Sequence, residues 1–288
     1  MTHDDFSVPS GLGDAPRRLT TVIDALLGAG ALLVLGAWLA GRPLFYSASS
    51  PVMSPFTAAS ILLMVAVRQA HLHLTTWPMA LSLAVIGIVL GGNVSSMVML
   101  ATTPAELWAS FPGLVLTSTM TSVGLVLFCA YEIVIALRET PRSAFILDDL
   151  LVHLALVPGG LSLLGYLLGN PTYLSIQADP RVGISPLEMA FLGAYAVAAV
   201  LSNPGLFLWR FLAAGWANRA VFAALVANQF VAPVVVALVF STPGRRGLGL
   251  EAAVMLAGVV ATLSFLLLQA RLAARNLAAS PPGGQPAA

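Results

Sequence analysis

The sequence contains two similar stretches, GRPLFYSASSPVMSPFTA at residues 41–58 and GNPTYLSIQADPRVGISPLEMA at residues 169–190, and their spacing indicates how the chain is organised. Both begin with Gly-x-Pro-x-aromatic, carry a serine two residues after the aromatic residue, and reach Ser-Pro before an apolar run. Glycine often ends a helix, and proline cannot continue one. Ser-Pro is typical of a helix N-cap followed by the first helical residue. Each stretch therefore predicts a helix end, a loop and a new helix start.

The chain around these stretches is strongly apolar. It is 58% hydrophobic and 9% charged, with a mean hydropathy of +0.92, whereas soluble domains are roughly 25% charged. Apolar runs of about 18 or more residues can cross the hydrocarbon core of a bilayer, where a helix satisfies its own backbone hydrogen bonds. The sequence therefore predicts an all-α integral membrane protein. Its eight predicted transmembrane helices are 19–40, 53–70, 79–100, 112–137, 146–168, 185–203, 219–241 and 249–272.

The arginines set the expected orientation, since the chain has no lysine. With the N-terminus in the cytoplasm, nine arginines fall in cytoplasmic segments and four in outer loops. The positive-inside rule favours this arrangement, so both termini are expected in the cytoplasm. The net charge of +1 gives no reason to expect nucleic acid as a partner.

The two Gly-x-Pro stretches follow the first and fifth predicted spans, so each half of the chain holds four spans in the same orientation. This predicts a parallel 4+4 internal repeat of helical hairpins, with a pseudo-twofold axis along the membrane normal. Asp24 and Asp149, and Asn93 and Asn228, are further candidate equivalent pairs. The predicted organisation is a polar N-terminal segment (1–18), a first repeat (19–137), a cytoplasmic linker (138–145), a second repeat (146–272) and a disordered cytoplasmic tail (273–288).

The repeated motifs resemble the multi-span membrane modules at the N-termini of bacterial sensor histidine kinases. In those modules a Met-x-Pro-x-Thr-Ala run opens a leucine-rich span after a Gly-Tyr-rich helix end. Here MSPFTAASILLM matches the run, and the pattern returns as ISPLEMAFLGAYAVAAVL after the helix end LLGYLLGNPTYLS. The matching residues are Met53, Ser54, Pro55, Thr57, Ala58, Tyr166, Pro171 and Tyr173. The resemblance implies a sensory module in a bacterial inner membrane. Here the sequence ends in RNLAASPPGGQPAA rather than in PAS and kinase domains, so a partner protein is expected to carry the output.

Two equivalent outer loops predict a shared ligand pocket near the axis, because repeats bind at their mutual interface. Tyrosine faces with a carboxylate at the rim suit a small, partly apolar molecule. The predicted pocket residues are Tyr46, Ser54, Thr57, Tyr166, Tyr173 and Glu188. The alternative is that the tyrosines belong to the aromatic belt at the membrane interface and that the Ser-Pro pairs only cap helices.

Ionisable residues within the spans form a second candidate site, because such residues usually face the bundle interior. Asp149 and His153 are spaced i, i+4, which permits a carboxylate–imidazole pair or half of a metal site. A second ligand pair is missing, so no metal is expected. The predicted inner polar cluster is Asp24, Glu132, Asp149 and His153, with a role in stabilising or transmitting a helix arrangement. The predicted mid-membrane polar residues are Asn93, Asn228 and Gln229.

The function expected from these patterns is a sensory or signalling module that responds to a small ligand or to the state of the membrane. An alternative is a small-molecule transporter, because the mid-membrane amides and the expected helix breaks at Pro158 and Pro233 are features of transport proteins. A further alternative is a structural subunit of a membrane complex. No nucleophile–base pair is found at a common depth, so no enzyme and no cofactor are expected. The expected partners are the lipid bilayer and the output protein, and self-association stays open.

Overall fold

The structure is a computed structural model that describes residues 15–45, 51–74, 78–102, 116–137, 146–174, 183–203, 205–240 and 249–279. Every regular element within these residues is a helix. The elements are α1 (Ala15–Leu39), α2 (Pro55–His73), α3 (Met79–Thr102), α5 (Thr119–Ala136), α6 (Ile146–Leu168), the short 3-10 helix η1 (Pro171–Tyr173), α7 (Pro186–Ser202), α8 (Phe207–Ala213), α9 (Trp216–Phe240) and α10 (Leu250–Ala279).

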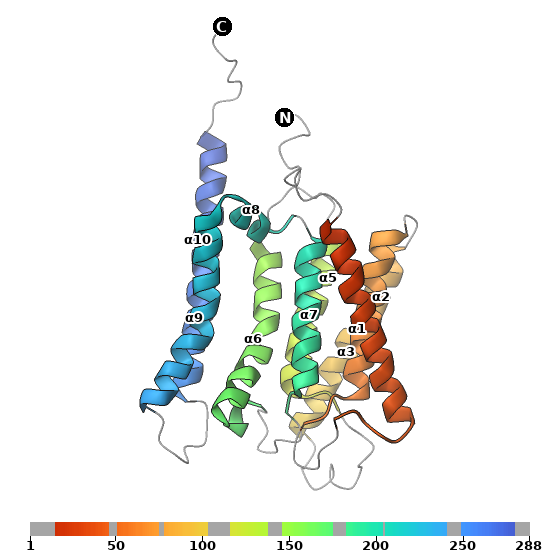
Figure 1. The fold of residues 1–288 in the computed structure, drawn as a ribbon. Helices are drawn as coiled ribbons and strands as arrows, with labels where there is room; N and C mark the ends of the chain where they lie inside the picture. The colour runs from red at the N-terminus through yellow and green to blue at the C-terminus, as the bar shows by residue number, and fades with distance from the viewer. Residues whose placement is uncertain are drawn as a thin grey trace.

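Seven of the described helices are long and apolar enough to cross a membrane, and the number rises to eight if α7 and α8 are counted as one bent span. α7 alone has 17 residues, which corresponds to about 26 Å of helix. It runs alongside the other long helices in Figure 1, while α8 turns away at the upper end. The all-α class is therefore confirmed, and the long apolar helices are those of a multi-pass membrane protein.

Each of the eight predicted spans overlaps one described helix, because the apolar runs themselves are helical. Two described helices, η1 and α8, lie wholly outside the predicted spans, and α1, α2, α3, α9 and α10 extend beyond theirs. α1 begins at Ala15, so that residues 15–18 of the predicted polar N-terminal segment are helical. α8 forms between the sixth and seventh spans, and α10 continues to Ala279, so that residues 273–279 of the predicted tail are helical. α6 and α9 run continuously through Pro158 and Pro233, where the sequence analysis expected helix breaks. The predicted linker, 138–145, lies outside the described residues.

The long helices form one bundle with a hairpin at its side (Figure 1). α1 packs against α2 and α7, and α5 packs against α3 and α6. α9 and α10 pack against each other, and their contacts with the rest of the bundle are made mainly with α6 and α8. α1 begins and α10 ends at the same end of the bundle. The main apolar core lies among α1, α2, α3, α5, α6 and α7, and a smaller core joins α8 to α10.

The two sequence stretches that opened the analysis form helix ends and helix starts of the same kind. Gly41 and Gly169 end the preceding helices with positive φ values of 68° and 62°, a conformation that glycine adopts without a steric cost. Ser54 and Ser185 are the N-caps of α2 and α7, and each is followed by proline at the first helical position. The helix boundaries predicted from the repeat are thus confirmed.

An aromatic side chain joins the end of one helix to the start of the next in both stretches. The indole Nε1 of Trp38 donates to the carbonyl of Met53 at 2.9 Å, and the hydroxyl of Tyr166 donates to the carbonyl of Ile184 at 2.9 Å. Met53 and Ile184 each immediately precede the N-cap serine. The hairpins α1–α2 and α6–α7 therefore share a tertiary hydrogen bond as well as their helix caps.

Candidate functional site

A buried arginine is the centre of a polar network near the upper ends of α1, α2 and α5. Arg68 of α2 is only 4% exposed. Its Nε donates to Oδ2 of Asp24 on α1 at 2.9 Å, and its Nη2 donates to Oδ1 of the same carboxylate. Gln69 also donates to Asp24, at 2.6 Å. A bidentate arginine–carboxylate pair has stringent geometry and is stronger than a neutral hydrogen bond, so it fixes α1 against α2.

Glu132 of α5 and Tyr195 of α7 complete this network. The Tyr195 hydroxyl donates to Oε1 of Glu132, and Arg68 Nη1 lies 3.8 Å from the same oxygen. The Arg68 guanidinium carbon lies 4.0 Å from the centre of the Tyr195 ring, a cation–π arrangement. Nη1 is left without a hydrogen-bond partner within the described residues. We call Asp24, Arg68, Glu132 and Tyr195 the Arg68 network; it holds one cation between two carboxyl groups.

The sequence analysis placed Asp24 and Glu132 in one polar cluster but missed Arg68 and Tyr195. Arg68 is near the C-terminal end of its helix, where an arginine can reach the aqueous interface by extending along the helix, and the positive-inside count places it among the nine cytoplasmic arginines. The other two members of the predicted cluster, Asp149 and His153, line a separate cavity between different helices.

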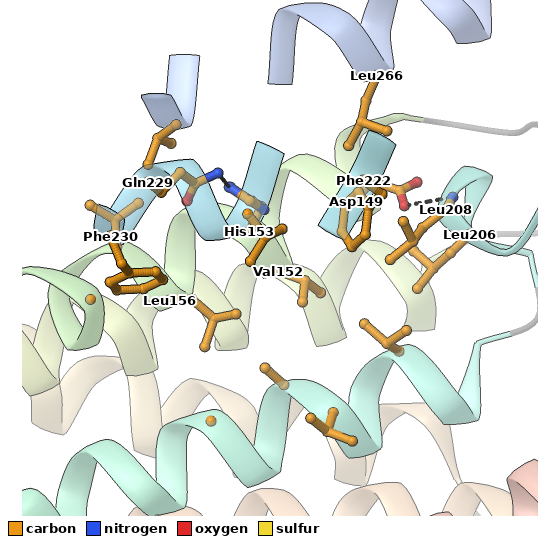
Figure 2. Close-up of a pocket in the computed structure, with 18 of the residues that line it drawn as sticks. Asp149, Val152, His153, Leu156, Leu206, Leu208, Phe222, Gln229, Phe230 and Leu266 are labelled. Carbon is orange, nitrogen blue, oxygen red and sulfur yellow. Dashed lines mark hydrogen bonds between the residues drawn. The ribbon is translucent and has the colours of Figure 1, made fainter. Parts of the chain in front are cut away.

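This second candidate site is a cavity of about 530 Å³ between α6, α7, α9 and α10, with α8 at one end. We call it the α6–α10 cavity. Its size falls within the range of small-molecule sites. Apolar side chains from all of these helices form most of its wall (Figure 2). Examples are Val152, Leu156, Leu208, Phe222, Phe230 and Met255.

Three polar side chains from α6, α9 and α10 meet beside this cavity. Nε2 of Gln229 lies 3.3 Å from Nε2 of His153 and donates to the Thr262 hydroxyl at 2.8 Å. Figure 2 shows the His153 and Gln229 side chains facing each other. The Thr262 hydroxyl in turn donates to the Gly258 carbonyl at 2.9 Å. The predicted Gln229 is therefore a cavity residue, and Thr262 was not predicted.

Asp149 connects the cavity wall to α8. Its Oδ2 accepts a hydrogen bond from the backbone N–H of Phe207 at 2.9 Å, and its Oδ1 accepts one from Leu208 at 3.0 Å. The latter bond is drawn in Figure 2. A carboxylate is favoured at the first amides of a helix because those N–H groups have no partner within the helix. Asp149 and His153 thus lie on one cavity but bond to different groups.

A third polar group gathers where α2, α5 and α7 begin. Glu188 is 1% exposed and accepts hydrogen bonds from the Thr57 hydroxyl at 3.0 Å and from the Ser185 backbone N–H at 2.9 Å. The Ser185 hydroxyl accepts from the Glu188 N–H at 3.1 Å, which completes a capping box. The Thr117 hydroxyl lies 3.2 Å from those of both Ser54 and Thr57. We call these residues the Glu188 cluster; its hydrogen bonds join helix starts from both halves of the chain.

The residues of the predicted outer pocket thus have other partners. Ser54, Thr57 and Glu188 are brought together as expected, but they are buried and bond to one another. Tyr173 is also fully buried; its hydroxyl donates to Glu251 at 3.2 Å and accepts from the Gly249 N–H at 2.9 Å. Tyr46 lies outside the described residues. The outer pocket stays a prediction, and Tyr173 does not face lipid as a belt residue would.

The mid-membrane amides differ in their surroundings. Asn93 is buried and donates to the Val89 carbonyl at 2.8 Å and to the Ser60 hydroxyl at 3.3 Å. Asn228 is exposed, whereas the adjacent Gln229 is buried. One residue corresponds to about 100° around a helix, so the interior amide of α9 is Gln229.

Among the described residues, no group of three or more His, Cys, Asp and Glu side chains is arranged to hold a metal ion. Comparisons of the chain with protein families, with curated protein sequences and with solved structures give no match.

Proposed function

We propose that the chain is a sensory module of a bacterial inner membrane, which binds a small molecule in the α6–α10 cavity and passes its occupancy to a partner protein through α8. The observation that carries this proposal is the position of Asp149, which both lines the cavity and holds the first amides of α8. A molecule that moves α6 relative to α10 therefore also moves the carboxylate to which the first amides of α8 are bonded.

The packing of α8 supports this route. Phe207 and Phe211 of α8 pack against Leu266 of α10, and the rings of Phe211 and Phe265 meet edge to face with centroids 5.6 Å apart. α8 is therefore attached to α6 by hydrogen bonds and to α10 by apolar contacts. It lies above the upper end of α6, beside the α9–α10 hairpin (Figure 1).

We further propose that the chain is a parallel 4+4 repeat with both termini in the cytoplasm. The shared caps and aromatic hydrogen bonds of α1–α2 and α6–α7 support the repeat, and the arginine count supports the orientation. Arg42→Cys and Asn170→Cys, at matching loop positions, are expected to react with an impermeant thiol reagent from outside the cell. Reaction of either only from the cytoplasm contradicts the orientation.

The sensory proposal is tested by a fluorescent label next to α8. Ala214→Cys places an exposed thiol just beyond α8, and the native Cys129 is buried. The probe is methyl octyl ketone, an uncharged lipophilic molecule that suits the mostly apolar wall of the cavity. In lipid nanodiscs it is expected to change the emission of an environment-sensitive label at this position. The same label at Ala101→Cys, at the end of α3, is the control and is expected to stay unchanged. An unchanged emission at position 214 at the highest soluble probe concentration contradicts the proposal.

Transport is the second candidate function, favoured by the His153–Gln229–Thr262 group inside spanning helices. α6 and α9 nevertheless continue through Pro158 and Pro233, whereas broken helices are typical of transporter binding sites. Facilitated flux of a small solute into proteoliposomes, lost in Gln229→Leu, is the result that favours transport over sensing.

A further inference from the structure

We infer that the α6–α10 cavity takes an uncharged lipophilic molecule that carries one hydrogen-bond acceptor, such as a carbonyl oxygen, and that His153 recognises this acceptor. The inference deepens the proposed function and rests on its choice of cavity. It follows from three properties of the wall: its apolar character, its charge, and one unused donor.

Among the residues that the structure describes, the wall is apolar apart from four side chains. Asp149, His153, Gln229 and Trp209 are the cavity-lining residues that have polar side-chain atoms. The Trp209 Nε1 is already used, because it donates to the Val200 carbonyl at 2.7 Å. The remaining surface is hydrocarbon, which favours a ligand whose body is apolar.

The charge of the wall disfavours an anionic ligand and does not require a cationic one. No arginine or lysine is among the described residues that line the cavity, so an anionic head group meets no cationic partner there and lies near the Asp149 carboxylate. Both oxygens of Asp149 already accept hydrogen bonds from α8 amides, so the carboxylate has partners without a cation, although its remaining lone pairs leave room for one. A buried charge without a partner is strongly unfavourable. An uncharged ligand avoids this cost.

The unused donor is on His153. An amide nitrogen only donates, so Gln229 Nε2 donates to His153 Nε2 as well as to Thr262. With the Gln229 amide nitrogen as the donor, a neutral imidazole accepts at Nε2 and carries its proton on Nδ1. Nδ1 has no hydrogen-bond partner in the part of the chain that the structure describes. A ligand with an acceptor oxygen satisfies this N–H group, whereas a pure hydrocarbon leaves it unpaired.

Gly193 gives a variant that fills the cavity without a clash. It lines the cavity from α7, and a Cβ built there meets no other atom within 4 Å. Gly193→Leu therefore places a larger side chain in free space on the cavity wall. Gly87 of α3 is also open to a Cβ and does not line the cavity, so Gly87→Leu is the matched control for the effect of leucine in a helix.

The experiment measures the fluorescence of Trp209, which lines the cavity, in nanodiscs. The quencher is methyl octyl ketone with a bromine on its terminal carbon, and the Trp209→Phe variant identifies the part of the signal that comes from Trp209. Unlabelled methyl octyl ketone, decane, decanoate and decylamine then compete for the site. The ketone is expected to compete at a concentration about tenfold below decane, which corresponds to one hydrogen bond in apolar surroundings. Decanoate and decylamine are expected to compete more weakly than the ketone. His153→Leu is expected to remove the tenfold difference, and Gly193→Leu, but not Gly87→Leu, to remove saturable quenching.

Several outcomes overturn the inference. Equal competition by decane means that the cavity takes any apolar chain, including a lipid acyl chain. Preference for decanoate or decylamine means that the ligand is charged. Identical quenching in Gly193→Leu means that the probe only dissolves in the bilayer. Saturable ketone binding without a response of the label at position 214 leaves this inference standing and contradicts the sensory proposal instead.

Discussion

The hairpins α1–α2 and α6–α7 have matching ends, but different side chains hold their helices together. Asp24 lies 14 residues before Trp38, and the residue 14 before Tyr166 is Val152. Arg68 lies 14 residues after the N-cap Ser54, and the residue 14 after Ser185 is Ala199. The first hairpin thus has a buried ion pair where the second has two small or medium apolar residues.

This difference separates a fixed part of the molecule from an adaptable one. The Asp24–Arg68 pair requires a defined geometry between α1 and α2. Apolar contacts are not directional, so we expect Val152 and Ala199 to constrain the angle between α6 and α7 less than the ion pair constrains α1 and α2. Val152 lines the α6–α10 cavity, as do Ala196 and Val200 on the same helix as Ala199. The cavity therefore lies beside the hairpin that lacks the ion pair.

The largest expected effect comes from removing the cation of the first hairpin, which tests whether the Arg68 network holds α1 against α2. Arg68→Met leaves Asp24 and Glu132 buried without their partner, and we expect a loss of about 3–5 kcal/mol in the free energy of unfolding. Thermal unfolding in detergent, followed by tryptophan fluorescence, measures this loss. Arg18→Met, at an exposed arginine of α1, is the control and is expected to change stability by less than about 0.5 kcal/mol. A midpoint for Arg68→Met equal to that of the control shows that the network does not hold α1 to α2.

The second prediction concerns the other hairpin. There Asp149 of α6 binds the first amides of α8, whereas Asp24 of α1 binds Arg68. Asp149→Ala removes the acceptor for two amides, and the loss of a helix cap costs about 0.5–2 kcal/mol. Hydrogen exchange at Phe207 and Leu208 is expected to accelerate, while exchange in the centre of α10 stays unchanged. Unchanged protection of both amides indicates that Asp149 does not anchor α8.

The smallest effect tests the likeness of the two hairpins rather than their difference. Trp38→Phe and Tyr166→Phe each remove one hydrogen bond to a carbonyl, worth about 1 kcal/mol. We expect both substitutions to lower the unfolding midpoint, Trp38→Phe more because it also removes ring atoms that pack against the core, and a smaller shift for Trp216→Phe, whose side chain is exposed. A large effect of one substitution and none of the other shows that the two bonds are not equivalent.

The spans and caps were predictable from the sequence because their causes are local. An apolar run has to form a helix in lipid, and Ser-Pro caps the helix that immediately follows it. Residues that act through distant contacts were harder to predict. The Arg68 side chain could extend to the membrane interface or lie in the bundle interior. It lies in the interior because it pairs with Asp24, which is 44 residues away in the sequence. The cavity depends on how the α9–α10 hairpin packs on α6, which no local pattern encodes.

The predicted equivalence of Asp24 and Asp149 shows how a small shift changes a role. Asp149 lies 17 residues before Tyr166, three more than Asp24 lies before Trp38. Three residues are nearly one turn of helix, so Asp149 keeps a similar face but lies closer to the helix start. There it meets the amides of α8 rather than a side chain of the next helix.

The Asp24–Arg68 pair also has a consequence for how the chain enters the membrane. Insertion of a single charged residue in a membrane-spanning helix is costly, up to about 2.5–3.5 kcal/mol at the helix centre. α1 and α2 each carry one of the two charges, and the pair neutralises both once the helices meet. The first hairpin is therefore expected to leave the insertion machinery as a joined pair. The second hairpin has valine and alanine at the matching positions, so these positions do not require α6 and α7 to enter the membrane together.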